Sequence, residues 1–230
     1  MDNRSSSLHR FMSAWRRDTS LSILLGLLAF LIFVMEPLRA TGLVKAIVLD
    51  VGFGMFAIAG VLVMTERPRT ARTGAVLALV AILIRALQWQ MPSPGMHLAQ
   101  GAVMEVFLVV LAWAVLHQVL APGLVTGHHI KGAVVVYLLL ALIWAQSYDL
   151  IEELFPGSFN PSGMPHRVEW TTFLYFSLVT LTTVGYGDVT ATAPFARSVA
   201  TAEAIIGQLF PAILIARLVS QELESRGTRK

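Results

Sequence analysis

The chain has 230 residues, of which 56% are hydrophobic and 13% are charged, and its mean hydropathy is +0.69. A water-soluble domain carries about 25% charged residues, so the composition indicates an integral membrane protein. The net charge of +3 gives no indication of nucleic-acid binding, and the absence of cysteine excludes disulfides and thiolate chemistry.

Six segments are apolar and long enough to cross a bilayer, for which a helix needs about 20 residues. They are 19–38, 44–65, 73–91, 98–120, 131–152 and 195–219. Prolines and glycines separate the first segments, and the short connections predict antiparallel neighbours. The predicted fold class is therefore an all-α membrane protein with six transmembrane helices, in which 19–120 forms a four-helix domain.

The first segment also has a second interpretation. Arg4, Arg10, Arg16 and Arg17 precede its apolar core, an arrangement that also occurs in secretory signal peptides. A small-x-small cleavage site does not follow cleanly, so a membrane span is favoured.

Lysine and arginine gather on one side of the predicted spans, and the side that is richer in them faces the cytoplasm. With the N-terminus inside, the outer side holds few basic residues, namely Arg39, Lys45, Arg167 and Arg197. The bias predicts cytoplasmic termini at 1–18 and 220–230 and an outer connection at 156–193. Short loops favour a multi-pass protein of a prokaryotic inner membrane.

The four-helix domain holds ionisable residues within its predicted spans, notably Asp50, Arg85 and Glu105. At a rise of about 1.5 Å per residue, these three residues lie at similar depth, where isolated charges are costly. We expect them to pair in a cluster that braces the bundle, and a proton or cation sensor is the alternative. Because 98–120 contains no lysine or arginine, we do not expect voltage sensing by moving arginines.

The outer connection contains the run Thr180-Leu181-Thr182-Thr183-Val184-Gly185-Tyr186-Gly187-Asp188. Gly185 and Gly187 can adopt backbone angles that are closed to other residues, so successive carbonyls can turn toward one side. The run resembles the filter pattern of potassium channels, and a dehydrated potassium ion needs such a cage of oxygens, to which the Thr183 hydroxyl adds. The candidate K+ ligands are Thr183, Val184, Gly185 and Tyr186, in a filter over 183–187. We expect no cofactor besides the permeant ion.

One subunit supplies only one wall of that cage. Irregular backbone at membrane depth is tolerated where protein buries it or where it lines a water-filled path. We therefore expect a homotetramer around a central axis in the lipid bilayer.

The run resembles the Thr-x-x-Thr-x-Gly-Tyr-Gly pattern of potassium channels, and the order of spans resembles the six-transmembrane, one-pore tetrameric members of that family. The resemblance implies a pore domain over 131–219. Its parts are an outer helix (131–152), a turret (156–168), a pore helix (169–182), the filter (183–187) and an inner helix (195–219).

The same resemblance implies that residues around the filter support it: Thr180, Thr182, Tyr175 and Asp188. Tyr175 is expected to hydrogen-bond Asp188. The chain departs from family patterns at Val179, where some prokaryotic channels carry a glutamate, and at Tyr175-Phe176, which replaces a tryptophan pair of voltage-gated relatives.

The predicted inner helix holds Gly207, at the usual place of a hinge glycine, and Pro211 one turn later. A proline bends a helix, so the pair is a candidate gating hinge, and a close-packing glycine with a static kink is the alternative. Glu203 lies one turn before Gly207. We favour a position behind the pore helix, bonded to its threonines, over one facing the cavity.

The function predicted from these features is passive K+ conduction. A non-conducting regulatory subunit that co-assembles with pore subunits is the alternative. An enzyme is not expected, because the chain has no intramembrane Ser/His pair, di-metal cluster or nucleotide motif.

Overall fold

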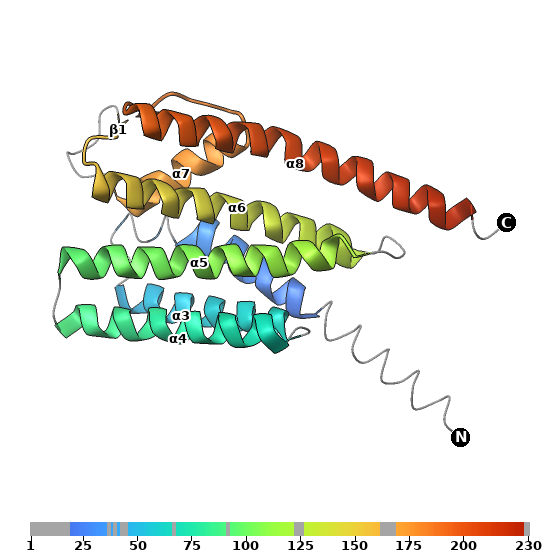
Figure 1. The fold of residues 1–230 in the computed structure, drawn as a ribbon, viewed down its shortest axis with the longest axis horizontal. Coiled ribbons are helices and arrows are strands. Elements are labelled where there is room, and N and C mark those ends of the chain that lie inside the picture. Colours follow the sequence, from blue (N-terminus) through green and yellow to red (C-terminus); the bar gives the residue numbers. More distant parts are fainter. Residues whose placement is uncertain are drawn as a thin grey trace, which may run out of the picture. The chain divides into compact units, whose positions relative to one another are not determined.

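A computed structural model describes most of the chain as helices (Figure 1). The described residues are 19–35, 38, 41, 46–65, 68–90, 93–121, 127–161 and 169–227. Besides helices, the described residues include one short ribbon of two strands.

The helices before residue 121 follow the apolar segments of the sequence. They are Thr19–Met35, which ends in the π-helical turn η1 (Leu31–Met35), then α3 (Ala46–Met64), α4 (Pro68–Gln90) and α5 (Pro94–Val119). Pro68 and Pro94 occupy the first position of their helices. A residue at this position donates no hydrogen bond within the helix, so the missing N–H of proline costs nothing there. The fourth and third helices therefore begin earlier than the apolar segments 98–120 and 73–91.

The described residues of the C-terminal half form three helices and the ribbon. Its elements are α6 (Gly127–Leu154), β1 (Phe159–Pro161), α7 (Trp170–Leu181), β2 (Val189–Ala191) and α8 (Pro194–Gly227). With 12 residues, α7 is about half as long as a helix that crosses a bilayer. α8 has 34 residues and continues to Gly227, so most of the segment 220–230, expected as a separate tail, extends this helix.

Four helices of the described residues are long and apolar enough to cross a membrane. They are Pro68–Gln88, Gly95–Val119, Gly127–Leu154 and Pro194–Gln221. The first two predicted spans correspond to shorter described apolar helices, Thr19–Met35 and Val51–Met64. The chain is thus a multi-pass membrane protein with a helical fold.

The described residues divide into two compact units. The first comprises residues from Met1–Ala75 and Leu111–Val136. Within it, Lys131 Nζ donates to Ser22 Oγ at 3.0 Å, and Gln118 Nε2 donates to the Val63 carbonyl at 3.1 Å. These bonds connect helices that are far apart in the sequence.

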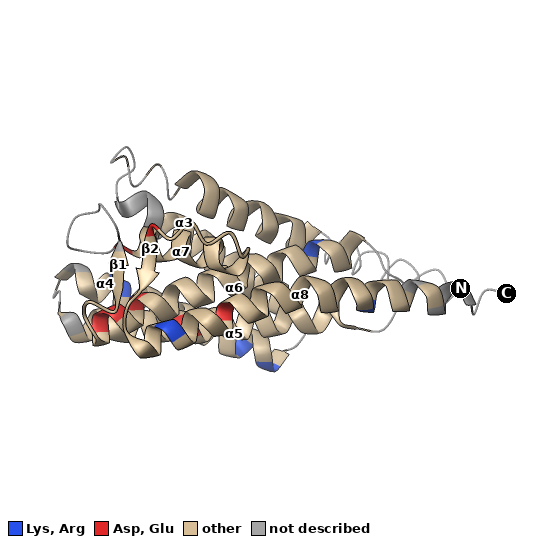
Figure 2. Ribbon diagram, turned by 90° about the horizontal axis from the view of Figure 1, so that it is seen from above, with Lys and Arg blue, Asp and Glu red and all other residues tan. Residues whose placement is uncertain are grey.

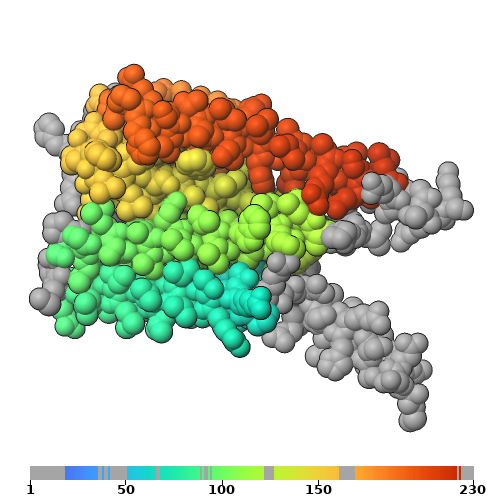
Figure 3. Space-filling model, in the orientation of Figure 1, coloured from blue at the N-terminus to red at the C-terminus, as the bar shows by residue number. Residues whose placement is uncertain are grey.

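The second unit comprises Val76–Val110 and Tyr137–Lys230, and it contains all of α7 and α8. Its core is an aromatic cluster in which Tyr148 of α6, Phe159 of β1 and Phe173 and Phe176 of α7 pack edge to face. Ring pairs in this geometry are favourable beyond their buried area. Figure 3 shows α8, in orange to red, as a ridge on the surface of this unit.

Candidate functional site

The segment Thr183–Gly187, directly after α7, has an alternating backbone conformation. Thr183, Gly185 and Gly187 have φ angles of 61°, 60° and 78°. Among the described residues, Thr183 is the one non-glycine residue with a positive φ. Val184 and Tyr186, between them, have no positive φ. A segment with φ of alternating sign can align its peptide groups on one side of the chain, as the glycine spacing predicted.

Every carbonyl of the last turn of α7 has a partner, although helix ends normally leave four carbonyls without one. The Leu178 carbonyl accepts from Thr182 N at 3.1 Å, and that of Thr180 accepts from Thr183 N at 2.9 Å. The Val179 carbonyl accepts from Val184 N at 2.9 Å and Gly185 N at 3.3 Å. The segment after the helix therefore closes the helix end with its own N–H groups.

The fourth carbonyl, that of Leu181, accepts a hydrogen bond from the Tyr137 hydroxyl of α6 at 3.0 Å. The ring of Tyr137 stacks on Phe210 of α8 at a centroid distance of 6.0 Å. Tyr137 thus connects the end of α7 to both neighbouring helices.

These bonds determine which way the carbonyls of the segment point. The described residues contain no cis peptide bond, and in a trans peptide the C=O points opposite to the N–H. Because Thr183 N, Val184 N and Gly185 N point at α7, the carbonyls of Thr182, Thr183 and Val184 point away from it. A row of oxygens directed outward from the helix end can coordinate a cation.

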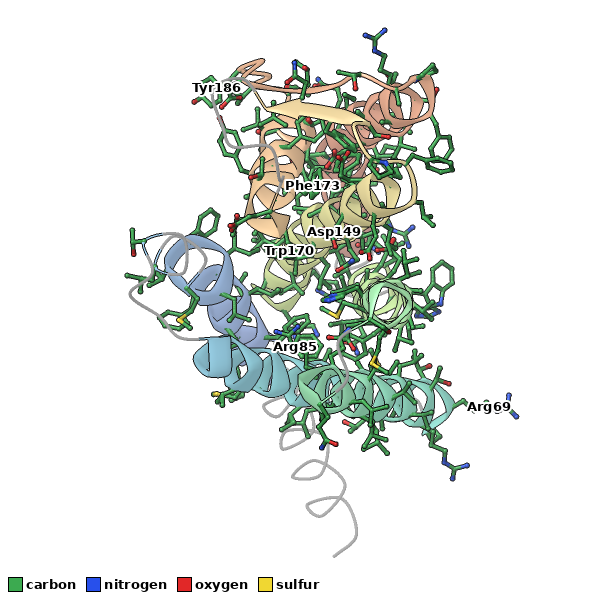
Figure 4. The ribbon with its side chains drawn as sticks, turned by 90° about the vertical axis from the view of Figure 1, so that its left-hand side faces the viewer. Arg69, Arg85, Asp149, Trp170, Phe173 and Tyr186 are labelled. Carbon is green, nitrogen blue, oxygen red and sulfur yellow. The ribbon has the colours of Figure 1, made fainter. Side chains whose placement is uncertain are left out.

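The side chains of this segment are poorly covered within one subunit. Val184 is 53% exposed and Tyr186 is 71% exposed. In Figure 4, Tyr186 lies at the edge of the unit, whereas Phe173 points into the interior. The segment is thus held by its backbone and leaves its apolar side chains open.

Of the four residues predicted to support the segment, two bond to each other through their side chains and two take part in bonds to backbone groups. Tyr175 donates to Asp188 Oδ2 at 2.8 Å, which is the bond expected from the sequence, and this bond raises the pKa of the Tyr175 hydroxyl. Thr182 Oγ1 donates to the Leu178 carbonyl at 2.6 Å, and the Thr180 carbonyl receives the Thr183 N–H. Their role in conduction stays a prediction.

The strand that follows Asp188 pairs with the strand that follows α6. β2 pairs antiparallel with β1, with Asn160 opposite Thr190. Glu152, at the end of α6, accepts from Gly157 N at 2.8 Å and Phe159 N at 3.2 Å. Figure 2 shows acidic positions gathered around this ribbon. The predicted turret residues 162–168 lie outside the described part of the chain.

Glu203 lies behind α7, in the position that the sequence favoured, and is fully buried. Its partners differ from the expected threonines. Tyr148 donates to Oε2, and Ser177 Oγ lies 2.5 Å from Oε1. Thr180 lies further along α7 and Thr182 follows its last residue, whereas Ser177 faces α8 at the level of Glu203.

Gly207 packs directly against the end of α7. A Cβ on Gly207 would lie 2.1 Å from the Leu181 carbonyl oxygen. Pro211 is inside α8 and does not interrupt it. Close packing, the alternative interpretation of Gly207, is therefore present, and the hinge role stays a proposal.

The predicted cluster of Asp50, Arg85 and Glu105 is described only in part. The Asp50 side chain lies outside the described residues. Glu105 Oε1 accepts from Ser147 of α6 at 3.0 Å, a partner that the sequence did not predict, and its Oε2 forms no hydrogen bond among the described residues. The three-residue cluster stays a prediction. Within the described ranges, no three His, Asp or Glu residues are grouped to hold a metal.

Sequence reasoning missed three polar residues that connect α6, α7 and α8, namely Tyr137, Tyr148 and Ser177. Tyr137 and Ser177 each stand between two apolar residues, and this is the signal that the sequence offers. A sequence does not show which helix face meets which neighbour, so the partners could not be named.

Residues 132–222 match a family model described as ion channel. The match covers α7, most of α8 and most of α6, including the Thr183–Gly187 segment. The chain therefore contains an ion-channel domain, and the match points to a channel and not an enzyme.

Two curated proteins are similar to parts of the chain. The "Two pore potassium channel c" of Oryza sativa subsp. japonica is 41% identical over 70 residues, which are 30% of this chain and 15% of that protein. The "Protein LctB" of Bacillus caldotenax is 34% identical over 87 residues, 36% of this chain and 64% of that protein. The chain thus spans 15% and 64% of the length of these relatives. No solved structure matches the chain.

Proposed function

We propose that the chain is one subunit of a homotetrameric potassium-selective channel with the filter Thr183–Gly187. The observation that carries the proposal is the alternating backbone of this segment, with its N–H groups bonded to α7 and its carbonyls directed away. Rings of backbone carbonyls that replace the hydration shell are the basis of potassium selectivity. The resemblance of part of the chain to a potassium channel supports the same ion.

The uncovered surface of one subunit supports assembly around an axis. The backbone of the segment is exposed, and its polar groups need a partner or water at membrane depth. The side chains of Val184 and Tyr186 are exposed as well. α8 adds exposed apolar side chains, among them Ile205, Leu209 and Ile213. In the tetramer we propose, other subunits cover the apolar groups and the carbonyls line the axis.

The proposal includes six spans with both termini in the cytoplasm. Thr19–Met35 and α3 would be the first and second spans, and the four candidate spans would be the third to the sixth. α7, too short to cross, would enter the membrane from outside and return through the filter segment. Lipid and K+ are the expected partners.

The test is ion flux from liposomes that contain the purified full chain. We expect K+ efflux that exceeds Na+ efflux and is blocked by barium. Gly185→Asp should abolish flux, because an aspartate at φ 60° places a side chain in the carbonyl row. Cross-linking should give a tetramer for both proteins.

Gly157→Asp is the matched control. Gly157 also has a positive φ, 87°, and like Gly185 has no atom within 4 Å of an added Cβ, but it lies in the turn before β1. Retained flux in Gly157→Asp with loss in Gly185→Asp supports the filter. Flux in Gly185→Asp refutes it, and a well-folded wild type without flux favours the regulatory subunit.

A further inference from the structure

The buried carboxyl group of Glu203 belongs to a continuous chain of polar contacts across three helices. Tyr148 of α6 contacts Oε2, and Ser177 Oγ of α7 lies 2.5 Å from Oε1. Ser177 Oγ also lies 2.9 Å from the carbonyl oxygen of Ala141 on α6. The order of the contacts is therefore Tyr148, Glu203, Ser177 and Ala141.

Each of these three contacts joins two oxygens and needs one hydrogen between them. The hydroxyls of Tyr148 and Ser177 carry one hydrogen each, and the Ala141 carbonyl carries none. If Glu203 is ionised, two hydrogens must serve three contacts. Ser177 Oγ then faces either the Ala141 oxygen or Oε1 at hydrogen-bond distance without a hydrogen between them, so two acceptor oxygens are in contact in the interior.

A protonated Glu203 supplies the missing hydrogen. Tyr148 then donates to Oε2, Glu203 donates from Oε1 to Ser177, and Ser177 donates to Ala141. Every group is satisfied, and the direction of each bond follows from the count alone.

The surroundings of Glu203 offer little to stabilise a negative charge. Its side chain has 0% exposure, and a buried carboxylate needs a paired cation or several donors. The titratable groups that face it are Tyr148 and Tyr137 of α6, and Tyr137 uses its hydroxyl on the Leu181 carbonyl. α7 contributes Ser177, and the neighbours one turn away on α8, Val199 and Gly207, carry no charge.

We propose that Glu203 is a proton-binding site whose proton completes the hydrogen-bond chain that fastens α8 to α6 and α7. The site lies one helical turn before Gly207, where α8 contacts the end of α7 beside the filter segment. Release of the proton breaks one link of the chain and loosens α8 at this place. The inference does not depend on which ion the channel carries.

Infrared difference spectra of the full chain in detergent test the proton directly. A protonated carboxylic acid has a C=O stretching band that a carboxylate lacks. We expect wild type minus Glu203→Gln to show this band at neutral pH. The control is Glu153→Gln, which changes an exposed acid at the end of α6 and should leave the Glu203 band in place. A spectrum without the Glu203 band overturns the proposal.

Ser177→Ala keeps Glu203 and serves where Glu203→Gln does not fold. It removes the acceptor of the carboxyl hydrogen, so the band should shift in frequency. A band at an unchanged frequency contradicts the hydrogen-bond chain.

Thermal unfolding gives a second readout. The folded subunit holds a proton that the unfolded chain has released at neutral pH, so the stability of the wild type should fall as the pH rises. Glu203→Gln keeps all three bonds, because its amide donates to Ser177 and accepts from Tyr148, and it should lose this part of the pH dependence. If Glu203→Gln lowers the unfolding temperature as far as Glu203→Ala, the proposal is wrong. Neither the infrared spectrum nor thermal unfolding measures ion flux, so a failure of the Glu203 proposal can be told apart from a failure of the proposed function.

Discussion

Gly207 of α8 and the Leu181 carbonyl of α7 are so close that a Cβ on Gly207 would lie 2.1 Å from the oxygen. The same oxygen accepts the Tyr137 hydroxyl. Pro211 lacks the N–H that would bond the Gly207 carbonyl in a regular helix. The end of α7, which precedes the Thr183–Gly187 segment, is therefore in contact with the point where α8 has lost one of its own bonds.

Gly207→Ala should destabilise the subunit by about 1–3 kcal/mol, the usual cost of overpacking, because backbone atoms and not a flexible side chain stand in the way. The measurement is thermal unfolding of the purified chain in detergent.

Gly54→Ala provides the control for that substitution. Gly54 lies inside α3 and has no atom within 4 Å of an added Cβ, so alanine there should leave stability unchanged or raise it by about 0.4–1 kcal/mol. Equal unfolding temperatures for the two variants would contradict the role of the close contact.

Tyr137→Phe should cost about 1–3 kcal/mol, because it leaves the Leu181 carbonyl without its donor. The ring and its stacking on Phe210 are kept, so the change isolates the hydroxyl. Chemical or thermal unfolding measures the loss. An effect no larger than that of Phe210→Leu, which removes the stacking and keeps the bond, would show that packing and not the bond is what matters.

The hydrogen bond between Tyr175 and Asp188 predicts a pH effect. The bond raises the pKa of the Tyr175 hydroxyl, so the folded state favours its neutral form. The stability that the bond contributes is present below the ordinary tyrosine pKa of about 10 and is lost as the pH rises through the higher folded value.

Tyrosinate absorbance during alkaline titration measures this shift, with Tyr175→Phe identifying the contribution of this residue among the 4 tyrosines. Asp188→Asn should bring the Tyr175 titration to lower pH, because the charged acceptor is gone. A Tyr175 titration that is the same in wild type and Asp188→Asn is the contrary result.

Glu152→Gln should loosen the turn between α6 and β1. The two oxygens of its carboxylate each accept one backbone N–H group. The glutamine side chain has a single, uncharged acceptor oxygen, so one of the two bonds is lost. At this partly exposed place the loss should lower the stability by about 1 kcal/mol. Limited proteolysis should cut the variant faster in the turn around Gly157. Glu153→Gln, the exposed neighbour, should be cut at the wild-type rate, and similar rates for the two variants would refute the role of Glu152.

Much of the helical architecture could be predicted because membrane helices follow apolar length. Helix ends were less predictable, since Pro68 and Pro94 begin their helices although a proline more often signals a break. The short ribbon was missed, because strands of three residues such as Phe159–Pro161 have too few side chains for an alternating pattern.

What the sequence determined by itself is local: the glycines at 185 and 187 permit the left-handed angles that the segment adopts, and a 12-residue apolar helix is too short to cross a bilayer. The tertiary structure decided the partners. Glu203 meets Ser177 and Tyr148, and Gly207 meets the Leu181 carbonyl, because these contacts depend on how neighbouring helices are rotated and shifted. In helices that are apolar on every face, hydrophobic periodicity does not specify that rotation.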